Sequence, residues 1–112
     1  MPHPLPDSLA ELIADRFRLL AEPTRIRILD RLRARELAVQ ELTAQLGTSQ
    51  QNVSKHLGLL HRAGIVAREK DGNTVRYRIA DATVFDLCEH VCGGIQRRLD
   101  DLRALMGEEV SR

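Results

Sequence analysis

The sequence predicts a mainly α-helical domain with one small β-hairpin. Apolar residues recur at three- and four-residue spacing in five segments, which is the pattern of amphipathic helices. Between the fourth and fifth segments, Asp71-Gly72-Asn73 separates two stretches in which apolar and polar residues alternate, and Asp-Gly is a strong hairpin signal. A length of 112 residues is enough for one domain with a modest core.

The composition excludes several classes of protein. Only three aromatic residues occur (Phe17, Tyr77 and Phe85), which argues against a single-strand binder that stacks bases on aromatic rings. No apolar run approaches the roughly 18 residues of a membrane span, and residues 1–6 resemble neither a signal nor a transit peptide. We therefore expect a cytoplasmic protein that does not contact membranes. In that compartment the two cysteines are expected to be free thiols rather than a disulfide.

We expect residues 1–7 to be a flexible segment, residues 8–106 to form the domain and residues 107–112 to be a tail.

Two helices are expected at the start of the domain. Asp7 or Ser8 is suited to cap a helix that runs to about Leu20, with Leu9, Leu12, Ile13, Phe17 and Leu20 on one side. Pro23 is suited to the first turn of a second helix, to about Ala34. That helix is expected to bury Ile26, Ile28, Leu29 and Leu32.

Two short helices follow, joined by a tight turn. The first spans about residues 39–46 and ends at Gly47; the second is capped by Thr48 or Ser49 and stops at Gly64. At about 100° per residue, the second helix has an apolar stripe and an opposite face of amides, hydroxyl and cations. This arrangement is a helix-turn-helix, whose second helix reads the major groove of DNA. The apolar stripe contains Val53, Leu57 and Leu60, and the polar face Gln51, Ser54, Lys55, Gly58 and Arg62.

The hairpin directly after this helix predicts a wing. Residues 65–70 and 74–79 read as its strands, and the second strand alternates Val75, Tyr77 and Ile79 with polar residues. Residues 48–80 carry six Lys or Arg against two acids, a net +4, whereas the segments before and after are neutral and negative. The full expectation is a winged helix-turn-helix of about five helices and a two-stranded wing, whose basic segment contacts nucleic acid.

Twelve residues are therefore candidates for DNA contact. Base reading is assigned to Gln51, Ser54 and Lys55. Phosphate or minor-groove contact is assigned to Gln50, Arg62 and the wing residues. For His56, a half-buried side chain bonded to backbone is as plausible as a phosphate contact. The recognition-helix set is Ser49, Gln50, Gln51, Ser54, Lys55, His56 and Arg62, and the wing set is Arg68, Lys70, Asn73, Thr74 and Arg76.

The last helix, about residues 82–106, is long and apolar along one side. Such a stripe needs a partner, and we expect a two-fold homodimer formed through the first and last helices. Each glycine of Gly93-Gly94 lowers helix stability by about 1 kcal/mol relative to alanine. The pair is therefore expected to allow either close contact with another helix or a bend. The stripe contains Val84, Cys88, Val91, Ile95, Leu99, Leu102 and Met106.

Four segments together resemble the ArsR/SmtB family of bacterial metalloregulatory repressors: 17–29, 49–57, 60–66 and 71–77. The resemblance covers about residues 8–105. It implies a homodimer that occupies an operator in double-stranded DNA and blocks transcription, until an inducer bound to the dimer loosens its hold. It also implies an imperfect palindromic operator, since two-fold symmetry relates the recognition helices.

The effector sites of the family are not reproduced. Arsenic and cadmium sensors carry two cysteines in the segment matching 36–42, where this chain has Ala38 and Gln40. The histidine pattern of the zinc sensors is absent from the last helix, where no histidine follows His90. The sulfide-sensing members pair a last-helix cysteine with one on the second helix, and no cysteine lies there.

Cys88 and Cys92 remain as candidate sensor residues. Their spacing of four places both sulfurs on one helix face, where they could ligate a soft ion such as As(III) or Cd(II), whereas His90 points about 150° away. Oxidation or modification by reactive sulfur species is a second reading. Simple packing is the third, because free cysteines are often buried. No cofactor is required by any of these readings.

Two other functions compete with a dimeric repressor. A protein-interaction module would use the same fold without the salt-dependent DNA affinity of a specific binder. An enzyme is disfavoured, because no catalytic triad, phosphate-binding loop or paired carboxylates can be recognised.

Overall fold

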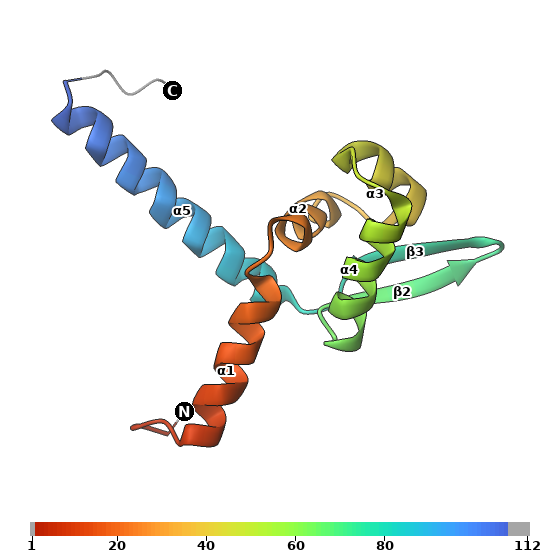
Figure 1. Cartoon of the computed structure of the whole chain (residues 1–112), viewed down its shortest axis with the longest axis horizontal. Coiled ribbons are helices and arrows are strands. Elements are labelled where there is room, and N and C mark those ends of the chain that lie inside the picture. Colours follow the sequence, from red (N-terminus) through yellow and green to blue (C-terminus); the bar gives the residue numbers. More distant parts are fainter. Residues whose placement is uncertain (1, 108–112) are drawn as a thin grey trace. The chain divides into compact units, whose positions relative to one another are not determined.

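The computed structural model describes residues 2–107 as five helices and a three-stranded antiparallel sheet. The chain divides into two compact units after Asp81, inside the segment that we expected to form one domain. The first unit holds four helices and the sheet; the second holds the last helix (Figure 1). The elements are α1 (Asp7–Leu20), α2 (Pro23–Leu32), β1 (Leu37–Ala38), α3 (Val39–Leu46), α4 (Gln50–Arg62), β2 (Val66–Asp71), β3 (Thr74–Ile79) and α5 (Ala82–Leu105).

The starts of α1 and α2 differ from each other in how they are capped. We expected Asp7 or Ser8 to cap α1, but Pro6 holds the cap position, its carbonyl accepts from two N–H groups and no side chain contributes. At α2 the expected Pro23 is in the first turn, and Glu22 Oε2 accepts from the N–H of Arg25 at 3.0 Å. The helix ends at Leu32, two residues before the expected end, near Ala34.

The core of the first unit lies between α2, α3, α4 and the base of the sheet. Leu29, Leu42, Leu57 and Ile65 are at most 2% exposed, and α4 contacts α2, α3 and β2. Ile26 is an exception to the expected core, because 45% of it remains exposed. The recognition-type helix is therefore fixed along its apolar side by neighbours that precede and follow it in the chain.

The sheet has one strand more than the expected two-stranded wing. Its order is β1-β3-β2, and the two residues of β1 pair with β3 as Leu37↔Tyr77 and Ala38↔Arg76. Strands β2 and β3 pair over six residues and form the hairpin that projects in Figure 1. Gly72 turns it with φ +64°, a conformation that glycine adopts without steric cost.

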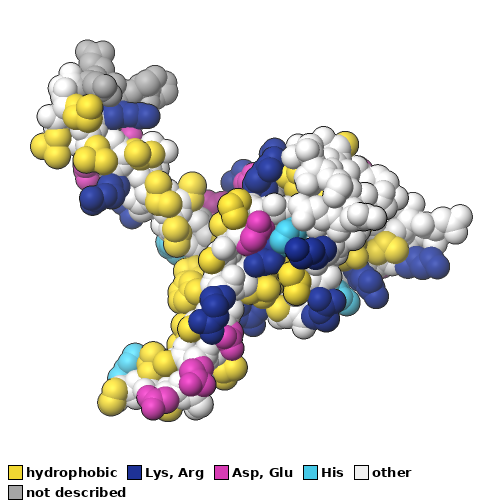
Figure 2. Space-filling model, viewed as in Figure 1, with side chains coloured by type: hydrophobic (Ala, Val, Ile, Leu, Met, Phe, Trp, Pro, Cys, Tyr) yellow, Lys and Arg dark blue, Asp and Glu magenta, His cyan; other side chains and the backbone are white. Residues whose placement is uncertain are grey.

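The second unit is a single helix, α5, that is continuous through Gly93-Gly94. A side-chain carbon added at either glycine would meet only the end of Arg97, at 3.5 or 3.8 Å, so nothing among residues 2–107 requires glycine there. Hydrophobic side chains gather along α5 in Figure 2, and Val91, Ile95, Leu99 and Leu102 are 43–58% exposed. Within residues 2–107, none of the helices combines the length and the hydropathy needed to span a bilayer.

Candidate nucleic-acid interface

The turn between α3 and α4 is held by side chains of the turn itself. Gly47 ends α3 with φ +66°, a left-handed conformation that favours glycine. Ser49 caps α4, since its Oγ accepts from the N–H of Asn52 at 3.1 Å. Asn52 Nδ2 donates in turn to Thr48 Oγ1 at 3.1 Å. These bonds fix the N-terminal end of α4, the end of a recognition helix that approaches base edges.

The polar face of α4 is open to solvent, while its apolar face is completely buried. Val53, Leu57 and Leu60 are 0% exposed. The guanidinium of Arg62 reaches back toward Gly58, where an added Cβ would lie 3.4 Å from Nη1. The described part of the chain thus leaves one continuous side of the helix uncovered, carrying amides, a hydroxyl and two cations. The exposed residues are Gln50, Gln51, Ser54, Lys55 and Arg62.

His56 is the exception among the recognition-helix candidates, and the structure corrects its assignment as a DNA contact. His56 is only 5% exposed, because its side chain faces the start of α2 rather than solvent. Arg25 Nη1 lies 3.1 Å from Nδ1 of His56, and Glu22 Oε2 lies 3.8 Å from Nε2. A guanidinium can only donate, so Nδ1 must be the acceptor and the neutral ring carries its proton on Nε2.

The ionisation of this cluster follows from its surroundings. Burial lowers the pKa of His56, and the charges of Arg25 and Lys55 add to this effect against an opposing contribution from Glu22. For Glu22, partial burial raises the pKa, but the N–H of Arg25 and the neighbouring charges outweigh it, so the net direction is downward. The cluster is therefore most stable with His56 neutral and Glu22 ionised.

Arginine side chains bind carbonyl groups at three helix ends, a role that no local sequence pattern could assign. Arg27 Nη2 donates to the carbonyl of Leu46 at 3.0 Å, at the end of α3. Arg16 Nη1 donates to the carbonyl of Ala63 at 3.2 Å, just after α4, and Arg25 Nε donates to the carbonyl of Leu19. Each satisfies a carbonyl at a helix C-terminus, where a cation also complements the helix dipole. Their partners lie up to 47 residues away, so no local pattern marks them.

The wing candidates fall into two groups. Arg68, Lys70, Asn73 and Thr74 are exposed, and Figure 2 shows Lys and Arg side chains along the wing. Arg76 is only partly exposed, and its Nη1 lies 3.2 Å from Glu41 Oε1 on α3. The free cations of the wing thus lie mainly on β2, the strand at the outer edge of the sheet.

The two cysteines of α5 are free, with Cys88 half-buried and Cys92 exposed. Burial, and to a smaller extent the charge of Glu89, raises the pKa of the Cys88 thiol. A raised pKa disfavours the thiolate, which is the reactive form. Within residues 2–107, no group of three or more His, Cys, Asp and Glu side chains is placed to hold a metal ion.

Comparison with known proteins gives the family. A family model described as a helix-turn-helix domain matches residues 20–69. The chain is 39% identical over 103 residues to the HTH-type transcriptional regulator KmtR of Mycobacterium tuberculosis, and the match covers 86% of this chain and 79% of KmtR.

Two solved structures share the fold. One is the AntR antimony-specific transcriptional repressor, 30% identical with a TM-score of 0.80, covering 88% of this chain and 90% of AntR. The other is Mb0332 from Mycobacterium bovis, a homodimeric winged helix-turn-helix DNA-binding domain described as a possible ArsR-family transcriptional regulator. It is 27% identical to this chain with a TM-score of 0.76, and the match covers 89% of this chain and 95% of Mb0332. With its helix-turn-helix, its wing and these relatives, the chain belongs to the ArsR/SmtB family of winged helix-turn-helix transcriptional regulators, which are DNA-binding proteins and not enzymes.

Proposed function

We propose that this regulator is a homodimeric repressor that binds an imperfect palindromic operator in double-stranded DNA through the polar face of α4. The observation that carries the proposal is the exposure of Gln51, Ser54 and Lys55 on a helix whose opposite side is fully buried. Amides and cations on such a face pair with base edges in the major groove. Gln50, Arg62 and the exposed wing residues are assigned to phosphates and the flanking minor groove.

The homodimer is supported by apolar side chains that each unit leaves uncovered. On α1, Leu12 and Phe17 are 65% and 51% exposed, and on α5 the stripe from Val91 to Leu102 is at least 43% exposed. Large exposed apolar patches mark interaction surfaces. The homodimeric state of Mb0332 supports a second copy as the partner. Two-fold symmetry then places the half-sites about 34 Å apart, one turn of B-DNA.

The inducer is proposed to act at Cys88 and Cys92. Thiolates are the donors that soft ions prefer, and the two residues lie one helical turn apart on α5. Their thiols are donors of the kind that such an ion binds, but one chain supplies only these two thiols, so a second copy would have to complete the ligand set. The antimony specificity of AntR favours a metalloid. The raised pKa of Cys88 disfavours the thiolate, which ion binding and thiol oxidation both need, so it does not choose between them. Packing alone is the outcome if no inducer acts there.

The DNA assignment is tested with a paired substitution on α4. Gln51→Ala with Lys55→Ala is expected to abolish specific binding in a mobility-shift assay, while circular dichroism and the dimer remain unchanged. The matched control, Gln96→Ala with Arg97→Ala on α5, removes one amide and one positive charge elsewhere and should bind normally. Equal binding by the paired α4 variant and wild type would exclude α4 as the recognition helix. A wild-type protein without salt-dependent DNA affinity would instead favour a protein-interaction module.

A further inference from the structure

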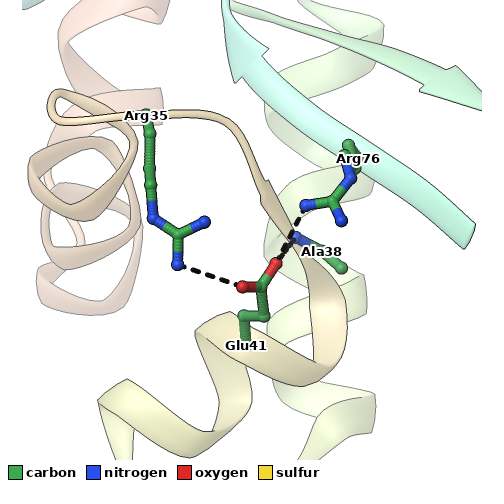
Figure 3. Close-up of polar contacts among 4 residues, drawn as sticks. All are labelled: Arg35, Ala38, Glu41 and Arg76. Atoms are coloured by element: carbon green, nitrogen blue, oxygen red, sulfur yellow. Dashed lines mark hydrogen bonds and ion pairs between the residues drawn. The ribbon is translucent and has the colours of Figure 1, made fainter.

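Four residues meet where α3 begins, and they join the helix-turn-helix to the wing (Figure 3). Glu41, in the first turn of α3, accepts through Oε1 from the N–H of Ala38 at 3.0 Å and from Arg76 Nη1 at 3.2 Å. Its Oε2 accepts from Arg35 Nη2 at 3.1 Å. A single carboxylate is therefore shared by α3, by β1 and by a side chain of β3.

The carboxylate is well suited to this role. The N–H of Ala38, then Arg35 and more weakly Arg76, lower the pKa of Glu41 against a smaller effect of burial. Glu41 is thus ionised at neutral pH, and its bond to Ala38 N–H also caps α3. The side chain is oriented by the helix that it caps, so the position of Arg76 is defined relative to α3.

The strand pairing at this point is too short to orient the wing by itself. Strand β1 contributes two residues, and one of its two pairs is Ala38↔Arg76. By contrast, β2 and β3 pair over six residues, which makes the hairpin itself well defined. Buried Val66 and Tyr77 anchor the base of the hairpin, but apolar contacts are not directional. The Glu41–Arg76 contact adds a directional bond at the junction.

We propose that Glu41 and Arg76 are a positioning pair that sets the wing relative to α3 and α4, and that Arg76 is not a phosphate ligand. This inference rests on the proposed DNA-binding function and replaces the sequence-based expectation for Arg76. Its Nη1 contacts Glu41 and its side chain is 35% exposed, whereas the other wing candidates are exposed. The pair affects the affinity for DNA because it holds the wing cations at a fixed position relative to α4.

The two roles of Arg76 predict opposite effects of Glu41→Gln. Glutamine keeps an acceptor for the N–H of Ala38 but removes the negative charge. If Arg76 contacted phosphate, loss of a competing carboxylate near DNA would strengthen binding. For a positioning pair, Glu41→Gln and Arg76→Gln should each weaken binding about two- to fivefold, as for a partly exposed ion pair. Because they break the same contact, the double variant should be no weaker than the worse single variant.

Salt dependence separates the roles independently. The probe is a DNA duplex selected by the wild-type protein from a random pool, and the association constant is measured from about 50 to 200 mM salt. A lost phosphate contact lowers the slope of log K against log salt by about 0.9 per subunit. We expect Arg76→Gln to leave this slope unchanged. Lys70 is an exposed cation of the wing, so Lys70→Gln should lower the slope.

Several outcomes of these binding measurements would contradict the positioning role of Glu41 and Arg76. Stronger binding by Glu41→Gln, a reduced slope for Arg76→Gln, or wild-type affinity in both single variants would overturn the positioning pair. A double variant clearly weaker than the worse single variant would also overturn it, provided that thermal unfolding shows the variant to be folded. A wild-type protein that selects no duplex would refute the proposed function instead, so the two failures are distinguishable.

Discussion

The guanidinium of Arg25 on α2 lies 3.1 Å from Nδ1 of His56 on α4. The same arginine donates through Nε to the carbonyl of Leu19, at the end of α1. One side chain therefore connects three helices of the first unit, including the helix assigned to DNA. The connection requires an unprotonated Nδ1, because both partners would otherwise be donors.

Stability should consequently fall as the pH drops below the ordinary pKa of histidine, about 6.5. Burial lowers the pKa of His56 in the folded state, so between the two pKa values the unfolded chain binds more protons and acid favours unfolding. His56→Asn keeps an acceptor near Arg25 but does not titrate. Urea unfolding between about pH 5 and 8 should show a flatter profile for the variant. Parallel profiles would exclude His56 as the titrating group.

A second loss of stability is expected at more acidic pH in both proteins. The pKa values of Glu22 and Glu41 are lowered in the folded state, so their contributions are present at neutral pH and disappear as the carboxylates protonate, below about pH 4.3. This window is separate from that of His56, and it serves as the internal reference when the same titration is extended to about pH 3.

Ser49→Ala is expected to destabilise the protein by about 1 kcal/mol, because it removes the N-cap of α4. Ser49→Asp retains a capping oxygen and should keep most of the stability. Its negative charge at the proposed DNA-facing end of α4 should nevertheless weaken operator binding. Chemical denaturation and mobility shift on both variants separate the two effects. Normal binding by Ser49→Asp would place this end of α4 away from DNA.

Leu99→Glu should convert the dimer into monomers. Leu99 is 43% exposed on the apolar stripe of α5, and a carboxylate there would be buried without a partner in the proposed interface. Size-exclusion chromatography with light scattering measures the molar mass directly. Arg98→Glu, at the neighbouring exposed position, introduces the same residue off the stripe and should leave the dimer intact. Dimers in both variants would require a different interface.

Cys88→Ser with Cys92→Ser tests the proposed sensor. As(III) or Cd(II) is expected to release the wild-type protein from its selected duplex and to leave the double-serine variant bound. A persulfide donor provides the comparison for sulfur chemistry, and release by this donor but by neither ion would assign thiol modification instead. If no treatment distinguishes the two proteins, the cysteines are packing residues and the inducer acts elsewhere or is absent.

The elements that could be predicted are those with strong local signals. Ser49 and Gly47 bound α4 and its turn in the expected way, and Asp71-Gly72 turns the hairpin. Strand β1 was missed, because two buried residues show no alternation. Its presence makes the sheet three-stranded and brings Arg76 to Glu41, so the same omission hid the junction with the wing.

The remaining differences arise from tertiary contacts. His56 lies at the edge of the apolar stripe of α4, where the helical angle alone leaves burial undecided, and Arg25 and Glu22 decide it from 31 and 34 positions away. Ile26 fits the helical pattern of a core residue but is exposed in the single chain. The capping arginines likewise depend on carbonyls distant in sequence.

Selection of duplexes from a random DNA pool by the wild-type protein tests whether α4 is the recognition helix of a dimeric repressor. We expect enrichment of an imperfect palindrome whose half-site centres are about 34 Å apart, with affinity that falls steeply as salt rises. The Gln51→Ala, Lys55→Ala variant should enrich nothing from the same pool. Recovery of no sequence by the wild-type protein, or of the same sequence by the variant, would contradict the assignment of α4 as the recognition helix of a dimeric repressor.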